Sequence, residues 1–186
     1  YRWERLTGEL RLVTVNAADD NGGDNTSGEP SISGNGRWIS YASDAGNLLA
    51  SLTDNNSSRD IYVRDMGDAS ALPAIIPSTA LVSHTASSIT TTGNWYSSSP
   101  RVSRDGTHIV YSSYSSDLQS GVSDANNQAD LVSYTISSGA NQYVSVESSA
   151  PSTVNRGSSR TDRSLSADGV YEVFTSDASD LVPGDS

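Results

Sequence analysis

The feature that most constrains the fold of this chain is an internal repeat. The segment 30–43 (PSISGNGRWISYAS) recurs at 100–113 (PRVSRDGTHIVYSS) and again at 163–176 (RSLSADGVYEVFTS). Each copy has a short β-prone segment, an Asn-Gly or Asp-Gly pair, and a second segment with apolar residues at alternate positions. This combination is the strongest short-range signal for a β-hairpin. A repeated supersecondary unit decides the architecture of the whole chain, so we expect one hairpin in each repeat.

Two further strands are predicted after each of the first two hairpins. An Asp-rich turn leads into a third strand at 60–64 in one copy and at 130–134 in the next. A fourth strand is predicted at 81–84 and at 143–146. Four short antiparallel strands that recur in this way are what a propeller blade requires.

The two ends of the chain complete the pattern. Residues 1–15 match the third and fourth strands, while residues 163–182 match the hairpin, so the ends are complementary half-blades. They could pair and close a three-blade ring, form the open edges of a larger propeller, or belong to a curved or stacked arrangement of sheets. We predict one all-β domain of propeller-like repeats of four-stranded antiparallel sheets, with about three blades. Its parts are a half-blade at 1–16, blades at 30–86 and 99–147, and a half-blade at 163–186.

Composition excludes several classes of function. The chain has 186 residues, no Cys, and a formal net charge of −11, with 22 acidic residues against 11 basic ones. Disulfides and thiolate chemistry are therefore absent, and nucleic acid or an anionic membrane surface would repel the protein. No apolar run is long enough to insert into a membrane. The abundance of Asp, Ser, Asn and Gly favours turns and oxygen-rich metal sites over helices.

The hairpin motifs resemble a known family. The Ser103-x-Asp105-Gly106 hairpin, its variants at 33–36 and 166–169, and the tail at 179–186 are similar to TolB-type, WD40-like β-propeller repeats of bacterial proteins. Family members usually have six or seven blades, so the number of repeats here departs from the pattern. Such repeats also occur in large, calcium-dependent bacterial surface adhesins. The resemblance therefore implies an adhesive function, bound calcium, and a location outside the cell or at its surface.

A spaced Asp/Asn motif between the second and third strands is the leading metal candidate. Calcium takes six to eight oxygen ligands, and an Asp-x-Asn start in a tight turn supplies several of them. The alternative is that these side chains only form Asx-turns with their own backbone. The acidic loop 19–25 is a secondary candidate, and a solvated loop explains it equally well. The predicted Ca²⁺ ligands are Asp54, Asn56 and Asp60, their repeats Asp124, Asn126 and Asp130, and Asp185, which begins a third copy.

Ligand-binding residues are predicted on one face of the blades. The loops after the second strand and the crossovers after the fourth strand emerge together, and loops on a rigid scaffold commonly carry binding sites. An aromatic pair beside guanidinium groups suits a peptide or carbohydrate ligand. The alternatives are packing of the aromatic pair between blades and simple solvation of the arginines. The candidates are Trp95, Tyr96, Arg156 and Arg160.

The sequence offers little support for catalysis. His84 and His108 are the two residues able to act as a base near neutral pH, and both fall on predicted strands. No nucleophile elbow, P-loop or dinucleotide fingerprint is present. We therefore expect no enzyme, but a calcium-dependent ligand-binding or adhesion module that binds a short peptide or glycan of another cell or protein. The alternative is a metal-free propeller scaffold for protein–protein assembly.

Overall fold

The computed structural model describes residues 1–68, 71–124, 126–147 and 152–184, with the backbone alone for 159–164. Within these ranges the chain forms strands and turns and no helix. It follows that no described helix could cross a membrane. The predicted all-β fold is confirmed.

Two four-stranded antiparallel sheets form the centre of the molecule. Each pairs its strands in chain order, and the register of the middle pair is the same in both sheets, with Ser43 opposite Asp60 and Ser113 opposite Asp130. The first sheet consists of β3 (Ser27–Ile32), β4 (Trp38–Ser43), β5 (Asp60–Asp65) and β6 (Ser78–Leu81). The second consists of β9 (Ser97–Val102), β10 (His108–Ser113), β11 (Asp130–Thr135) and β12 (Ala140–Tyr143).

Three two-stranded sheets accompany them. The first and last lie in the segments where half-blades are predicted. The middle one is a small hairpin in the crossover between the two larger sheets, which the sequence pattern did not predict. These sheets are β1 (Arg2–Trp3) with β2 (Leu10–Arg11), β7 (His84–Thr85) with β8 (Ser88–Thr92), and β13 (Ser158–Leu165) with β14 (Glu172–Ser176).

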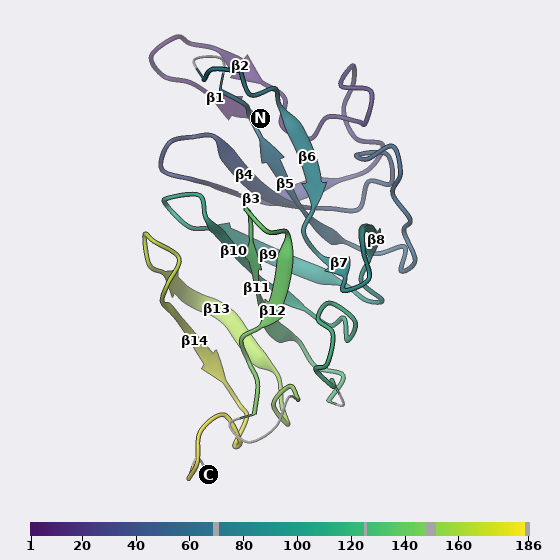
Figure 1. The fold of residues 1–186 in the computed structure, drawn as a ribbon, viewed down its shortest axis with the longest axis vertical. Coiled ribbons are helices and arrows are strands. Elements are labelled where there is room, and N and C mark those ends of the chain that lie inside the picture. The colour runs from purple at the N-terminus through teal and green to yellow at the C-terminus, as the bar shows by residue number, and fades with distance from the viewer. Residues whose placement is uncertain (69–70, 125, 148–151, 185–186) are drawn as a thin grey trace.

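The sheets follow one another along the long axis of the molecule, with the two chain ends at opposite ends of it (Figure 1). In the described residues β1 pairs with β2 and β13 pairs with β14, so the two half-blades do not pair with each other. The closed three-blade ring is therefore not formed. The sheets are propeller-like and follow one another in an open row.

The fourth strand of each large sheet lies three residues earlier than predicted. β6 ends at Leu81 and β12 ends at Tyr143, where the apolar pattern had suggested a beginning. Beyond these residues the chain turns inward, because Ser83 and Ser145 donate hydrogen bonds to buried carboxylates of the third strand. A non-local polar contact thus overrides local strand propensity.

Apolar packing lies on both faces of the first large sheet. One cluster joins it to the second sheet and includes Ala42, Ile61, Ile109 and Tyr111, all fully buried. The other cluster joins its opposite face to the N-terminal segment, including Val13. Because both faces are covered, β4 and β5 are buried along almost their whole length.

The hairpin turns are local backbone chemistry, as the sequence suggested. Gly36, Gly106 and Gly169 have φ angles of 73°, 75° and 70°, a left-handed conformation that favours glycine. In each turn a serine hydroxyl two residues before the Asn or Asp bonds its side chain, at 2.6–2.7 Å. The turns of neighbouring sheets are also joined, since Gly34 N donates to Arg104 O at 2.7 Å and Asp105 N to Ala167 O at 2.9 Å.

Candidate functional site: the joints between neighbouring sheets

The first Asp-x-Asn turn is held by its own side chains. Asp54 Oδ1 accepts hydrogen bonds from the backbone N–H groups of Asn56, at 3.1 Å, and Ser57, at 2.8 Å. The Asn56 side chain donates from Nδ2 to the carbonyl oxygens of Gly93, at 2.7 Å, and Trp95, at 3.0 Å. The turn is therefore fastened to the crossover that leads into the next sheet.

The second turn repeats this arrangement. Asp124 Oδ1 accepts from Asn126 N and from Thr153 Oγ1, each at 3.1 Å. Asn126 Nδ2 donates to the carbonyl oxygen of Val154, the counterpart of Gly93. In both turns Oδ1 of the Asp and Oδ1 of the Asn accept hydrogen bonds from protein donors, as the Asx-turn alternative named above requires.

Asp60 and Asp130, which end these motifs, are buried inside the sheets. Ser83 Oγ donates to Asp60 Oδ1 and Ser145 Oγ to Asp130 Oδ1, at 2.8 Å in both sheets. Burial raises the pKa of Asp60 to about 8 and that of Asp130 to about 7, although the serine hydrogen bond opposes each rise. The nearby carboxylates of Asp54 and Asp124 add to the increase.

The geometry adds no direct support for calcium. Across the part of the chain that the structure describes, no three or more His, Asp or Glu side chains are grouped so that they could hold a metal ion. Asp185 lies outside the described residues. The calcium site therefore stays a prediction, and the Asx-turns account for the contacts observed.

The acidic loop 19–25 does not gather its carboxylates either. Asp19 pairs with Arg64 Nη2 at 2.7 Å, and Asp20 accepts from Asn16 Nδ2 at 2.8 Å. Asp24 Oδ1 instead accepts from the backbone N–H of Gly46 at 2.9 Å. Each carboxylate has a different protein partner.

The structure places the predicted ligand-binding residues in different surroundings. Tyr96 is half-buried, and its ring centroid lies 6.4 Å from that of Tyr114 at an interplanar angle of 56°. Trp95 is 63% exposed and Arg156 is exposed, so neither is packed between sheets. Arg160 lies in β13, and its side chain is outside the described part of the structure.

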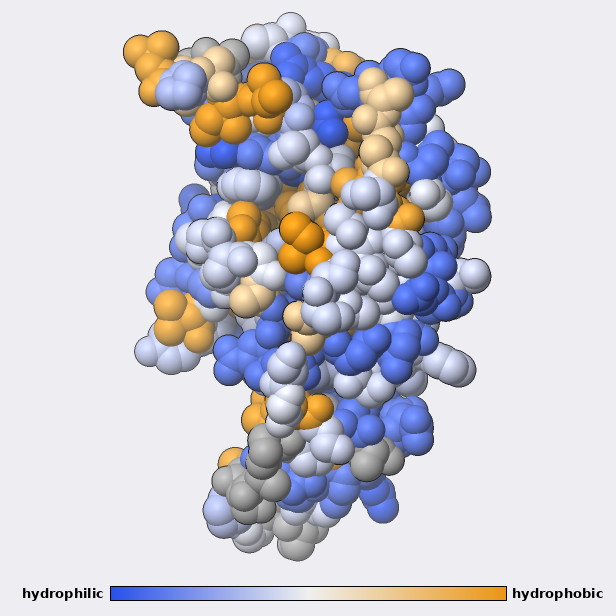
Figure 2. Space-filling model, turned by 45° about the vertical axis from the view of Figure 1, so that its right-hand side comes forward, coloured by the Kyte–Doolittle hydropathy of each residue, from blue (hydrophilic) through white to orange (hydrophobic). Residues whose placement is uncertain are grey.

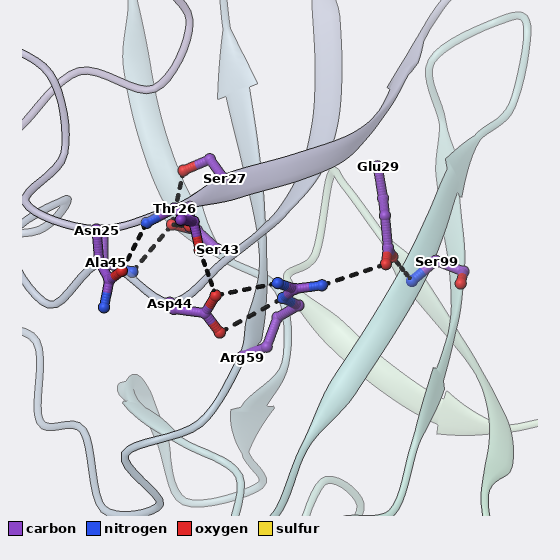
Figure 3. Close-up of polar contacts among 9 residues, drawn as sticks. All are labelled: Asn25, Thr26, Ser27, Glu29, Ser43, Asp44, Ala45, Arg59 and Ser99. Atoms are coloured by element: carbon purple, nitrogen blue, oxygen red, sulfur yellow. Dashed lines mark hydrogen bonds and ion pairs between the residues drawn. The ribbon is translucent and has the colours of Figure 1, made fainter.

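The joint between the first and second large sheets is closed by an ion-pair network, which we call the clamp: Thr26, Glu29, Asp44 and Arg59 (Figure 3). Arg59 Nη2 lies 3.0 Å from Asp44 Oδ2, and Arg59 Nη1 lies 3.4 Å from Glu29 Oε1. Thr26 Oγ1 donates to Asp44 Oδ2 at 2.6 Å. Glu29 then accepts a hydrogen bond from the backbone N–H of Ser99, in the first strand of the next sheet.

The charges of the clamp reinforce one another. The hydrogen bond from Arg59 holds the pKa of Asp44 below its ordinary value, and Asp44 in turn raises the pKa of Arg59. Glu29 occupies a strand irregularity in β3 and has a φ of 53°, an uncommon conformation for a residue with a side chain.

We call β13–β14 the third sheet, because it follows the two large sheets along the chain. At the joint between the second large sheet and this third sheet, the clamp residues are replaced by residues of other types. Each clamp position has an equivalent 70 residues further along the repeat, and the four equivalents are Tyr96, Ser99, Tyr114 and Ala129. All four border an open groove of about 390 Å³. The groove is lined by Tyr96, Ser98, Ser99, Ser112, Tyr114, Gln128, Ala129, Gly157, Ser158 and Asp177.

Sequence reasoning found Tyr96 but missed Tyr114, Gln128 and Asp177. A signal for the groove was nevertheless present. When the repeats are aligned, the charged residues Glu29, Asp44 and Arg59 have the uncharged counterparts Ser99, Tyr114 and Ala129. The second joint therefore differs from the first, because all three charged side chains are replaced by uncharged ones.

The two histidines have structural contacts. His84 is 5% exposed, and its Nδ1 and Nε2 atoms lie 2.8 Å from Thr85 O and 2.9 Å from Gly139 O. His108 Nδ1 lies 2.9 Å from Thr107 Oγ1 in a hairpin. Neither lines the groove.

Comparisons with known proteins give a structural likeness without a sequence match. No protein-family model matches the chain, and no curated protein matches it. Among solved structures, the chain is similar to TolB from Acinetobacter baumannii, with a TM-score of 0.40 and 13% sequence identity. The likeness covers 87% of this chain and 31% of the TolB chain, so this chain spans about a third of the length of that protein. The description of the sheets as propeller-like depends on the strand order and packing given above.

Proposed function

We propose that this chain is a non-catalytic ligand-binding module whose binding site is the groove between its second and third sheets. One observation carries the proposal. The four positions that form the clamp at the first joint are replaced, at the second joint, by residues that leave an open groove with two tyrosine rings.

The groove has the properties of a small-ligand site. Its volume of about 390 Å³ falls within the usual range of ligand pockets, roughly 300–1,000 Å³. It lies on the loop face, at the ends of strands that are fixed by their sheets. Sites of this kind are held in place by a rigid scaffold while their side chains vary.

The ligand class that suits the loop face is a short peptide or a glycan, and an adhesive role outside the cell or at its surface is part of the same proposal. Binding in the groove needs no ion, because the neighbouring turns are held by their own hydrogen bonds. Calcium remains a separate proposal, in which an ion would stiffen these turns. Its ligands would come from Asp54, Asn56, Asp60, Asp124, Asn126, Asp130 and Asp185.

The test of the proposal is a variant in which clamp residues of the first joint are introduced at the second joint, where they should close the groove. The double variant Tyr114→Asp/Ala129→Arg copies Asp44 and Arg59 into the second joint. Arg59 and Ala129 make the same backbone contact, since each carbonyl accepts from the first strand of the next sheet at 2.9 Å. The variant should therefore fold normally.

Wild type and variant are screened against an immobilised short-peptide library and a glycan array. Ligands bound by the wild type should be lost from the double variant, whose melting temperature stays within a few degrees. The substitution Arg101→Lys is the matched control, because Arg101 lies on the same sheet and outside the groove lining. Equal binding by the double variant, or no ligand in either collection, contradicts the proposal.

An assembly scaffold is the second candidate, and the N-terminal end of the molecule favours it. Apolar residues gather there on the surface (Figure 2). Leu6 is 85% exposed, and in the loop between β5 and β6 Leu72 is 99% and Ile76 is 79% exposed. Surface clusters of this kind often mark contacts between proteins. A scaffold would show concentration-dependent assembly by sedimentation that Leu72→Ser/Ile76→Ser abolishes and the closed-groove variant retains.

A further inference from the structure

We infer that the ligand of the groove is an uncharged saccharide. This inference rests on the proposed function and extends it by naming the ligand class. It follows from three properties of the lining: the paired tyrosine rings, the hydrogen-bonding groups, and the charge.

The tyrosine rings provide apolar surfaces with polar ends. The Tyr96 and Tyr114 ring centroids are 6.4 Å apart and the rings are inclined at 56°, so they present two surfaces at an angle. Tyr114 is 41% exposed, which leaves its ring open to a ligand. A pyranose ring has C–H faces that pack on aromatic surfaces and hydroxyl groups around its rim. Tyrosine matches both parts, because it combines an aromatic face with a hydroxyl that donates and accepts.

The polar lining suits hydroxyl groups. Gln128 carries an amide that both donates and accepts, Ser112 a hydroxyl that does the same, and Asp177 a carboxylate that accepts. Gln128 and Asp177 are exposed and come from the two sheets that border the groove, before β11 and after β14. Each saccharide hydroxyl donates one hydrogen bond and accepts others, so it can pair with any of these groups.

The charge of the described lining disfavours acidic ligands. Among the lining side chains that the structure describes, Asp177 is a carboxylate and none is basic. The chain as a whole has a net charge of −11. A phosphate, a uronic acid or an acidic peptide would therefore be repelled both locally and at long range.

The shape of the groove disfavours an extended peptide. Peptides commonly bind by adding a strand to an open sheet edge, which requires a continuous run of backbone. The lining here comes from five separate segments, at 96–99, 112–114, 128–129, 157–158 and 177. None of them offers more than four consecutive residues, so a compact ligand fits better than an extended one.

The experiment measures binding of the full chain to a glycan array that carries uncharged, acidic and sulfated oligosaccharides. We expect binding to uncharged members. Tyr114→Ala should weaken it by about tenfold, whereas Tyr114→Phe, which keeps the ring, should stay within about threefold. Asp177→Asn should admit acidic saccharides that the wild type rejects. Tyr171→Ala, at an exposed tyrosine outside the groove lining, should bind like the wild type.

The outcomes separate this inference from the proposed function. Binding of uncharged saccharides that is lost in Tyr114→Ala and in Tyr114→Asp/Ala129→Arg supports both. Peptide binding that the double variant loses, with no saccharide bound, overturns the saccharide assignment and leaves the binding function in place. Saccharide binding that survives both variants overturns the site, and the absence of any ligand overturns both statements.

Discussion

The two joints between sheets share a backbone and differ in their side chains. At the first joint Ser97 N donates to Arg59 O, and at the second Ser158 N donates to Ala129 O, both at 2.9 Å. Pairs of serine hydroxyls also recur at the strand ends of the two large sheets and of β13–β14, at 2.8, 2.9 and 3.1 Å. The backbone bond between the sheets is therefore the same at both joints, although one joint has a clamp and the other a groove.

This comparison separates two roles within the repeat. The backbone bonds join neighbouring sheets, whereas the serine pairs and the buried Asp60 and Asp130 connect segments within one repeat. The clamp lies near the surface, since the Arg59, Asp44 and Glu29 side chains are 29–33% exposed. Ion pairs at such exposure contribute about 0–1 kcal/mol each. The clamp positions can therefore vary at small cost in stability, which is what a binding site requires.

The largest expected effect concerns the shared part, the buried carboxyl groups. In the folded protein the pKa values of Asp60 and Asp130, about 8 and about 7, lie above the ordinary value of 3.8. The folded state therefore binds these protons more tightly than the unfolded chain. The stabilisation that comes from binding these protons is fully present below about pH 4 and is lost as the pH rises to about 8. The free energy of unfolding in urea should fall by a few kcal/mol between pH 5 and pH 8.

Asparagine at either position keeps the serine contact and removes the charge. Asp60→Asn and Asp130→Asn should each flatten this pH dependence, and both sheets should respond alike. If neither variant changes the slope, other groups cause the dependence. If only one of the two variants flattens the pH dependence, the two carboxyl groups do not have the same role.

The next effect concerns the clamp itself. Arg59→Ala leaves the carboxylates of Asp44 and Glu29 without their common cation, so we expect a loss of about 1–2 kcal/mol in the free energy of unfolding. The loss should shrink in 1 M salt, because salt screens the remaining repulsion. Arg11→Ala is the control, since Arg11 pairs with Glu9 at 2.7 Å with both side chains more than 40% exposed. An equal loss in the control would show that the clamp has no special role at the joint.

A smaller difference is expected between equivalent positions of the two joints. Asp44→Ala removes the contacts with Arg59 and Thr26 and should cost about 1 kcal/mol. Tyr114→Ala removes an exposed ring and should cost no more than about 0.5 kcal/mol. Thermal melting of the two variants measures the difference. A loss of about 3 kcal/mol or more in Tyr114→Ala would make this residue a packing residue of the core and not the wall of an open groove.

The smallest expected effect is that of calcium. Oδ1 of Asp54 and Oδ1 of Asp124 already accept protein hydrogen bonds. If these contacts take the place of an ion, millimolar calcium should raise the free energy of unfolding by less than about 0.4 kcal/mol, the value for an ion at its dissociation constant. Melting in calcium and then in excess chelator measures the change. An increase of about 2.7 kcal/mol, as for an ion at one hundred times its dissociation constant, would establish ion sites if Asp54→Ala and Asp124→Ala abolish it.

The strands and hairpins could be predicted from the sequence because their signals are local. Asn35-Gly36 and Asp105-Gly106, with alternating apolar residues after them, define both the turn and the strands that it joins. The ends of the fourth strands could not be predicted in this way. They depend on Ser83 and Ser145, whose partners lie 23 and 15 residues earlier in the chain.

The candidate site was less accessible to sequence reasoning. The spacing of Asp54 and Asn56 is the same whether their oxygens bind an ion or cap a turn, so spacing does not distinguish the two. The groove depends on how the third sheet packs on the second, which a single repeat does not encode. Only the comparison of equivalent positions, such as Arg59 with Ala129, indicates the change.

The paired backbone bonds at the second joint have a kinetic consequence. The bond from Ser158 to Ala129 fastens the loop side of the two sheets, and the bond from Asp105 to Ala167 fastens the hairpin side. Bonds on both sides restrict the movement of one sheet against the other, which favours a groove that is already formed before the ligand binds. A ligand would enter a preformed site by simple encounter. Changes in the lining would then alter the lifetime of the complex far more than the rate at which it forms.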